Sequence, residues 1–445
     1  MVSENIAAIS TGLVASGVAV IRISGDSPLE IAEKMFKPLG KIKVKDFEPY
    51  KMYVGEISGT GFTDFGMCVY FKGPKSFTGE DIVEFHSHGG TAITKGILQK
   101  ILSLGARLAT NGEFTKRAFM NGKLSLSSAE GLIEMINSES VSGVKAGYYL
   151  YREKLTNEVI ALQDTLTDVL AEIDADMDFP EEDLEKASTD TLVSSVKHVL
   201  EKIGQILSTY RTGRKLKNGV KVGIVGKPNT GKSSLFNAML SFDKAIVSDV
   251  AGTTRDIVEG STDINGVTFN FSDTAGIRES DDKIESLGVV LSKRVLDQSD
   301  VLLFVLDGGD ITEEDEQIYS LVKDKNVIVA LNKTDKGDYK LDRADIYVSA
   351  KTGERVEDLK QMLFDKTIGS GMDINGDFLC EERHYDALSR AKVKLQMALD
   401  GVGNAPLDLL AIDIKDGWDA LGEISGKTAT EEIINDIFSK FCVGK

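Results

Sequence analysis

Gly226-Lys227-Pro228-Asn229-Thr230-Gly231-Lys232-Ser233 matches the phosphate-binding pattern G-x-x-x-x-G-K-[S/T]. The alternating apolar residues of 220–225 predict a half-buried strand before it, and 234–240 predict a helix after it. This order aims backbone N–H groups and the positive end of a helix dipole at phosphate. Lys232 is expected to reach the β- and γ-phosphates, and the Ser233 hydroxyl to ligate Mg²⁺. The predicted contacts in this loop are Asn229, Thr230, Gly231, Lys232, Ser233 and Ser234.

The composition is that of a globular chain with several domains. At 445 residues it is too long for one core, and two to four domains are expected. No apolar run reaches the roughly 18 residues of a membrane span, and no signal-peptide pattern begins the chain, so we expect a cytoplasmic protein without membrane association. The three cysteines predict neither disulfides nor a zinc cluster. No cysteine or third histidine accompanies His86 and His88, and these two residues are interpreted as structural.

The net charge of −18 opposes binding of nucleic acid by overall charge, so any RNA contact must be local or shared with a partner. One basic stretch precedes the phosphate loop and contains Arg211, Arg214, Lys215, Lys217 and Lys221. It is either a binding patch or a solvated linker.

The order of patterns predicts four segments. Residues 1–118 mix strands (17–25, 67–71, 82–85) with helices (27–36, 91–104) and form an α+β domain. Residues 119–217 are helical by periodicity, with a break at Pro180. Residues 218–370 alternate strands and helices, which indicates a doubly wound α/β sheet. Residues 371–445 are helical again. We therefore expect one discontinuous all-α domain with the nucleotide domain inserted in it.

Three further motifs follow predicted strands. In Asn332-Lys333-Thr334-Asp335 the carboxylate can accept the N1–H and N2–H₂ of guanine, which adenine lacks, and Ser349-Ala350-Lys351 can support the base with a backbone N–H. Asp273-Thr274-Ala275-Gly276 is placed for a second Mg²⁺ contact and a γ-phosphate N–H. In this order the motifs predict a GTPase.

The residue after Gly276 is Ile277, where many GTPases carry a glutamine that orients the attacking water. Arg278, Glu279 and Glu285 are candidates for that work. Asn229, with backbone carbonyls from 248–254, can cage a monovalent cation that offsets transition-state charge. The alternative is that Asn229 only stabilises the loop. Arg255 or Arg278 would then act as an arginine finger, the side chain that supplies positive charge to the transition state.

Several strings outside these motifs carry a family resemblance. They are Arg22–Gly25, Phe77–Asp81, His88–Gly90, Gly112–Phe119, Asn121–Leu124, Asp249-Val250-Ala251-Gly252-Thr253-Thr254-Arg255-Asp256 and Phe441–Lys445. With the GTPase motifs, they make the whole chain resemble the MnmE/TrmE family of tRNA-modification GTPases.

The resemblance implies a homodimer formed through the N-terminal domain and an FAD-containing partner, MnmG (GidA). Together they would add a carboxymethylaminomethyl or aminomethyl group at C5 of wobble uridine in tRNA. The one-carbon unit would come from a tetrahydrofolate derivative, 5-formyl or 5,10-methylene. By motif match the folate contacts are Arg22, Glu84, Lys123 and Lys445. For Arg22 and Glu84 the alternative is a mutual ion pair that supports the domain.

The resemblance also assigns the catalytic ions. Asn229, Ser248, Val250 and Thr253 would bind K⁺, Ser233 and Thr254 would bind Mg²⁺, and Glu285 would position the water after the GTPase domains approach each other. Nucleotide contacts would extend over Ser248, Asp249, Val250, Ala251, Gly252, Thr253 and Thr254. Cys442 lies in a tail that either packs toward the folate site, taking part in the chemistry, or is frayed and inert. Lipidation is not expected, because Gly444 and Lys445 do not fit a prenylation box.

Two other functions compete. A switch GTPase of ribosome assembly would share the GTPase motifs but lack folate chemistry. A P-loop ATPase or kinase conflicts with Asn332-Lys333-Thr334-Asp335.

Overall fold

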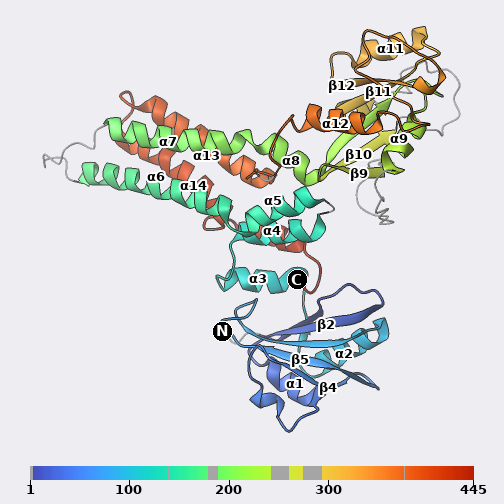
Figure 1. The fold of residues 1–445 in the computed structure, drawn as a ribbon. Helices are drawn as coiled ribbons and strands as arrows, with labels where there is room; N and C mark the ends of the chain where they lie inside the picture. Colours follow the sequence, from blue (N-terminus) through green and yellow to red (C-terminus); the bar gives the residue numbers. More distant parts are fainter. Residues whose placement is uncertain (1–3, 139, 179–188, 242–259, 274–292, 375) are drawn as a thin grey trace, which may run out of the picture. The chain divides into compact units, whose positions relative to one another are not determined.

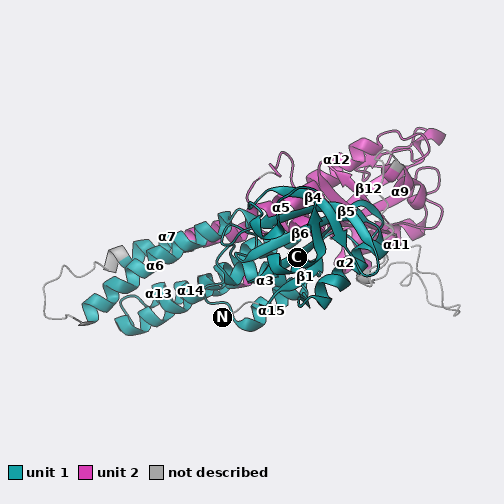
Figure 2. Cartoon of the chain, turned by 90° about the horizontal axis from the view of Figure 1, so that it is seen from below, with its two compact units in different colours: residues 1–133, 150–200, 387–445 teal, residues 134–149, 201–386 magenta. Residues whose placement is uncertain are grey.

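The computed structural model of the chain describes residues 4–138, 140–178, 189–241, 260–273, 293–374 and 376–445 (Figure 1). It divides into two compact units (Figure 2). The first comprises residues 1–133, 150–200 and 387–445, and the second residues 134–149 and 201–386. The predicted fold class is confirmed: an α+β N-terminal region, a discontinuous set of helices and an inserted P-loop α/β region.

The N-terminal region is built on a seven-stranded sheet with the order β3-β4-β5-β6-β2-β1-β7. Its strands are β1 (Ile6–Ile9), β2 (Ser16–Gly25), β3 (Phe36–Pro38), β4 (Met52–Ser58), β5 (Thr63–Phe71), β6 (Asp81–Gly89) and β7 (Arg107–Leu108). Helices α1 (Pro28–Met35) and α2 (Thr91–Ser103) and the short 3₁₀ helix η1 (Val44–Asp46) accompany it. Ile21 and Ile23 alternate along β2 and pack with Phe85 and Ile97 in one buried core, as the period of two predicts.

The predicted strand 82–85 is longer in the structure. Strand β6 continues to Gly89 because its backbone pairs with β2, where Val20 lies opposite His86 and Ala19 opposite Ser87. His86 Nε2 lies 3.3 Å from Glu84 Oε2, and His88 Nδ1 lies 2.7 Å from Asp64 Oδ1. The interpretation of these two histidines as structural stays a prediction.

The helices that follow are α3 (Glu113–Met120), α4 (Leu126–Asn137), α5 (Val141–Tyr151), α6 (Lys154–Asp178), α7 (Thr189–Ser208) and α8 (Tyr210–Asn218), and later α13 (Glu382–Gly401), α14 (Leu407–Ser425) and α15 (Glu431–Ser439). Figure 1 shows the long helices α6, α7, α13 and α14 running side by side. The three-or-four spacing of Leu155, Val159, Leu162 and Leu166 places four buried side chains on one face of α6, which packs against α14. The predicted break at Pro180 lies outside the described residues.

The inserted region has a six-stranded sheet with the order β13-β12-β11-β8-β10-β9. Its elements are β8 (Val220–Val225), α9 (Lys232–Ser241), β9 (Gly260–Ile264), β10 (Val267–Asp273), α10 (Lys293–Gln298), β11 (Val301–Asp307), α11 (Glu313–Val322), β12 (Val327–Asn332), η3 (Thr334–Lys336), β13 (Ile346–Tyr347) and α12 (Val356–Thr367). All neighbouring pairs are parallel except β9 with β10. The strand order reverses at β8, so the loop after β8 lies where open α/β sheets bind ligands.

The basic stretch before β8 is a helix, α8, rather than a linker. Lys217 lies 2.8 Å from Glu134 and 2.7 Å from Glu381, and Lys215 donates to the Thr367 carbonyl. Burial alone would lower the pKa of Lys217, but the two carboxylates raise it. Part of this basic stretch therefore holds its own unit together. No helix among the described residues has the length and apolar content of a membrane span.

Candidate functional site

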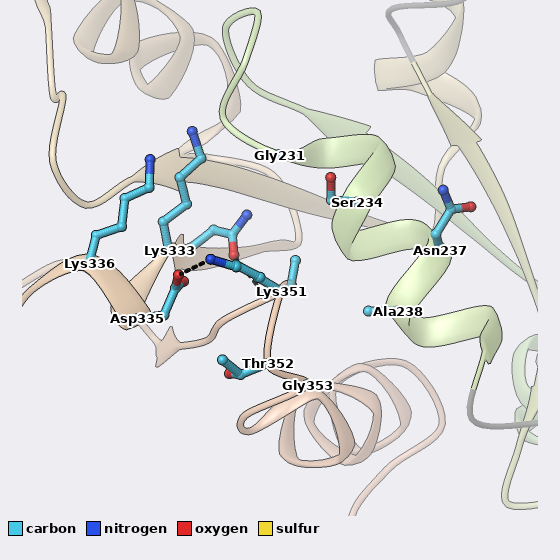
Figure 3. A pocket seen from close by; sticks show the side chains of 12 residues that line it. Gly231, Ser234, Asn237, Ala238, Lys333, Asp335, Lys336, Lys351, Thr352 and Gly353 are labelled. Atoms are coloured by element: carbon cyan, nitrogen blue, oxygen red, sulfur yellow. Dashed lines mark hydrogen bonds and ion pairs between the residues drawn. The ribbon is translucent and has the colours of Figure 1, made fainter.

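The candidate site is a cavity of 690 Å³ at the carboxyl ends of β8 and β12. Figure 3 shows Ser234 and Asn237 of α9 on one side and Asp335 and Lys351 on the other. It is lined by Gly231, Ser234, Asn237, Ala238, Asn332, Lys333, Asp335, Lys336, Ala350, Lys351, Thr352 and Gly353. Motifs distant in the sequence thus meet at one edge of the sheet.

The phosphate loop needs glycine at its two motif positions. Gly226 (φ +147°) and Gly231 (φ +93°) both have left-handed backbone. A Cβ at Gly226 would collide with the Val305 carbonyl, and one at Gly231 with the Asn332 amide. The two glycines let the loop turn closely around the end of β8.

Lys232 lies at the centre of this loop. Its ammonium group donates to the carbonyls of Gly226 (2.8 Å) and Lys227 (2.9 Å), and the side chain is buried. Thr230 Oγ1 donates to the same Lys227 carbonyl at 3.1 Å. The backbone of the loop therefore surrounds the Lys232 ammonium group, at the position where P-loop proteins bind phosphate oxygens.

Asn229 adopts left-handed backbone (φ +66°), a conformation that asparagine tolerates better than most residues. Its carbonyl accepts a 2.6 Å hydrogen bond from Lys333 Nζ, which also lies 2.6 Å from Asp307 Oδ2. Burial alone would raise the pKa of Asp307, but the hydrogen bond from Lys333 lowers it. Among the described residues, the exposed Asn229 side chain has no hydrogen-bond partner. The loop therefore uses the backbone of Asn229 and leaves its amide group toward solvent.

Hydrogen bonds to the two neighbouring loops hold the predicted guanine-binding motif, residues 332–335, in place. Asn332 donates to the Thr230 carbonyl (2.9 Å) and accepts from the Ala350 amide (3.0 Å), so it joins the phosphate loop to the loop after β13. Asp335 accepts a 2.8 Å hydrogen bond from Ser349 Oγ, and its other oxygen lies 4.0 Å from Lys351 Nζ. A carboxylate fixed at the wall of this cavity suits guanine's paired donors.

The remaining nucleotide and ion contacts are only partly within the described residues. Ser233 is the second residue of α9, and Asp273 ends β10, where its backbone pairs in register with Ile224 of β8. The predicted contacts Ser248, Asp249, Val250, Ala251, Gly252, Thr253, Thr254, Thr274, Ala275, Gly276 and Glu285 lie outside the described residues.

One residue of the site was missed from the sequence. Lys227 is buried in the phosphate loop, and its ammonium lies 3.0 Å from Asp315 Oδ2, 3.1 Å from Asp310 Oδ2 and 3.2 Å from Thr312 Oγ1. Thr312 and Asp315 form the capping box of α11. Burial alone would lower the pKa of Lys227, but Asp315 and Asp310 raise it. The pattern Thr-x-x-Asp was visible in the sequence, but its pairing with a distant lysine was not.

In the N-terminal region, Arg22 and Glu84 lie opposite each other in β2 and β6, with Arg22 Nε 2.7 Å from Glu84 Oε1. The mutual ion pair considered from the sequence is therefore present. The Arg22 guanidinium also lies 5.5 Å from the Phe77 ring centroid and 5.7 Å from that of Phe114. Burial alone would raise the pKa of Glu84, but His86 and Arg22 lower it.

The tail packs on the same region and is not frayed. The amide of Phe114 donates to the Lys445 carbonyl (3.2 Å), and Asn111 forms a β-bridge with Val443. Cys442 is exposed. Phe114 therefore has two neighbours of interest, the Lys445 carbonyl at its backbone amide and the Arg22 guanidinium beside its ring. Lys123 donates to the Pro74 carbonyl at 2.9 Å and lines a second cavity with Phe77.

Comparison with known proteins gives full-length matches. Residues 5–123 match the family of the GTP-binding protein TrmE N-terminus, and 126–442 the MnmE helical domain. The chain is 37% identical over 460 positions to the tRNA modification GTPase MnmE of Thermoanaerobacter pseudethanolicus, covering 100% of both chains. It is 37% identical to that of Acetivibrio thermocellus, covering 99% of both. A segment that covers 33% of the chain is similar to the G domain of the T. maritima FeoB iron transporter, and the match covers 98% of that domain (25% identity, TM-score 0.25). The chain belongs to the MnmE family of tRNA modification GTPases.

Proposed function

We propose that this chain is a potassium-dependent GTPase that acts with the FAD-containing protein MnmG. Together they install a (carboxymethyl)aminomethyl group at C5 of wobble uridine in tRNA, with a tetrahydrofolate derivative (5-formyl or 5,10-methylene) as the one-carbon source. The observation that carries the proposal is the full-length match to tRNA modification GTPases, joined to a cavity that brings the phosphate loop and the Asp335 carboxylate together. The protein would act in the cytoplasm, where its tRNA substrate is found.

The proposed division of labour follows the predicted domains. Residues 1–118 bind the folate and form the homodimer. Residues 119–217 and 371–445 form the helical domain, with the Cys-Val-Gly-Lys tail, and residues 218–370 bind and hydrolyse GTP.

The residues of the phosphate loop fit GTP and Mg²⁺. Lys232 is held inside the loop, where it would neutralise the β- and γ-phosphates, and Ser233 follows it at the start of α9. Ser233 and Thr254 would hold Mg²⁺, with Asp273 near it, and the metal would offset charge that develops on the phosphate oxygens. Asp335 would select guanine, supported by Ser349, Ala350 and Lys351.

Asn229 supports the potassium part of the proposal, because its side-chain amide is exposed and the loop does not engage it. Asn229, Ser248, Val250 and Thr253 would hold K⁺, which would supply the positive charge that an arginine finger brings elsewhere. Ile277 can neither donate nor accept a hydrogen bond, so Glu285 would orient the water.

For the folate, the pairing of Arg22 with Glu84 supports one shared site, and Phe114 beside Arg22 also binds the Lys445 carbonyl through its amide. The Glu84 carboxylate would pair with the pteridine ring, and the cations, Lys123 among them, would meet the anionic tail. Cys442, exposed on the docked tail, would act in the one-carbon chemistry.

The proposal is tested by mass spectrometry of tRNA nucleosides from a strain that lacks this gene. Wobble uridines should lose their C5 group, and the wild-type gene should restore it, whereas an Asp335→Asn gene should not. Unchanged uridines in the deletion strain would contradict the proposal and favour a GTPase switch of ribosome assembly.

A further inference from the structure

A second cavity, of 410 Å³, lies wholly within the first compact unit. Its volume falls in the range of small-molecule sites, roughly 300–1,000 Å³. It is lined by Ser76, Phe77, Lys123, Leu124, Ser128, Tyr151, Arg152 and Glu153. The lining comes from the loop before β6, the segment between α3 and α4, the first turn of α4, the end of α5 and the turn between α5 and α6.

The two cations of this cavity have no carboxylate partner among the described residues. Within those residues, Lys123 donates to a neutral carbonyl, that of Pro74, at 2.9 Å. Arg152 is exposed and, within the part of the chain that the structure describes, has no ion-pair or hydrogen-bond partner for its guanidinium. By contrast, Arg22, Arg107 and Arg117 of the same unit are all paired with carboxylates. In a chain with a net charge of −18, two unneutralised cations lining one cavity indicate an anionic ligand.

Among the residues that the structure describes, the acidic residue of the cavity, Glu153, forms no ion pair with either cation. Its Oε1 instead accepts hydrogen bonds from the Ser125 amide (3.3 Å) and from Ser128 Oγ (3.1 Å), which hold the carboxylate at the start of α4. Tyr151, a residue 40% exposed, also lines the cavity and carries a hydroxyl that can donate. The lining thus includes a tyrosine and two cations that lack a carboxylate partner among the described residues.

The cavity adjoins the residues assigned to folate. Phe77 lines it and also lies 5.5 Å from the Arg22 guanidinium, while Lys123 belongs to both sets of residues. Phe77 thus links the neighbourhood of Arg22 to the cavity that Lys123 and Arg152 line. An elongated anion that begins in the folate region and continues into this cavity fits the arrangement.

We propose that this cavity binds the γ-linked polyglutamate tail of a reduced folate, with Arg152 and Lys123 as its carboxylate-binding residues. The inference rests on the proposed folate function and extends it by assigning Arg152 and Tyr151. Each added glutamate brings one carboxylate, which guanidinium and ammonium groups bind through charge-assisted hydrogen bonds. Polyglutamylated folate would then be the preferred form of the cofactor.

The test is calorimetric titration of the purified full-length protein with 5-formyltetrahydrofolate and with its pentaglutamate. The pentaglutamate should bind about five- to tenfold more tightly, as expected for one or two solvent-exposed ion pairs, and this advantage should fall as salt rises. Arg152→Gln should remove most of the advantage and leave monoglutamate affinity within about twofold. Arg152→Lys should keep part of it. Lys95→Gln, which removes one exposed charge of α2 away from the cavity lining, should keep all of it.

The outcomes separate the two proposals. If neither ligand binds to the wild type, the folate function itself is wrong. If both ligands bind with equal affinity, or if Arg152→Gln keeps the full advantage, folate binding stands and the tail site is wrong. Unchanged monoglutamate binding by Arg152→Gln also shows that the variant is folded.

Discussion

Asp335 is the side chain that we propose selects the base. Ser349 Oγ donates to one of its oxygens at 2.8 Å, and Asn332 links the neighbouring loops, so the carboxylate is fixed before any ligand arrives. A preorganised acceptor loses little entropy on binding and penalises a base that has no matching donors.

We predict that Asp335→Asn weakens GTP binding by about a hundredfold, because guanine's N1–H and N2–H₂ then face an amide donor in place of a charged acceptor. Xanthosine triphosphate, which presents an oxygen in place of the amino group, should bind the variant better than the wild type. Competition titration against a fluorescent guanine nucleotide measures both effects. Asp338→Asn is the matched control, because Asp338 is exposed, lies three residues from Asp335 in the sequence and does not line the cavity. Equal GTP affinity in Asp335→Asn and wild type would show that the base lies elsewhere.

At the scale of elements, Lys227 fastens the phosphate loop to the N-terminus of α11. Its partner Asp315 is fully buried, so removal of the lysine would leave a carboxylate without its cation in a poorly solvated place. The helix cap and the phosphate loop therefore depend on each other.

We predict that Lys227→Met destabilises the nucleotide-binding unit by about 3 kcal/mol and weakens GTP binding, since breaking a buried pair leaves one charge uncompensated. The double variant Lys227→Met/Asp315→Leu should recover much of the stability, because both charges are gone, yet not the GTP affinity. The stability of the nucleotide-binding unit is measured by urea denaturation, on the unfolding transition that added GTP shifts. The GTP affinity is measured by nucleotide titration. Additive losses in the double variant would show that the two residues are not coupled.

Helix α3 is held at its N-terminus by a carboxylate with two arginine partners. Glu113, in its first turn, lies 2.7 Å from Arg107 and 3.1 Å from Arg117 and accepts from the Thr110 amide at 2.9 Å. Burial alone would raise the pKa of Glu113, but these hydrogen bonds lower it to about 2. A carboxylate with a depressed pKa contributes stability above its unfolded pKa and loses that contribution as the pH falls through its folded pKa.

Glu113→Gln should therefore destabilise the first unit by about 1–2 kcal/mol at pH 7, a figure that allows for solvent screening of this partly exposed group. The difference from wild type should shrink as the pH falls from about 4.5 toward 2. Thermal unfolding of wild type and of Glu113→Gln across that pH range measures this difference in stability. A difference that stays constant with pH would show that the charge of Glu113 is not what stabilises α3.

Across the whole molecule, motifs made of consecutive residues could be predicted from the sequence, whereas contacts between residues far apart in the sequence could not. The phosphate loop and the guanine motif each lie within a few residues, and each follows a strand whose apolar pattern is plain, so their position at one sheet edge was foreseeable. The four-residue strand β1 was not predicted, because its place between β2 and β7 depends on partners far along the chain. The Lys227–Asp315 pair was hidden for the same reason.

The central claim is that a GTPase without a catalytic glutamine depends on a monovalent cation held by Asn229. Its most direct test is the rate of GTP hydrolysis by the full-length protein in potassium and in sodium, at equal ionic strength and saturating GTP and Mg²⁺. We predict that potassium accelerates hydrolysis at least about tenfold over sodium, which corresponds to about 1.4 kcal/mol of transition-state stabilisation. Asn229→Ala should lose this difference while GTP affinity changes little. Equal rates in the two salts, or full potassium activation of Asn229→Ala, would contradict the claim.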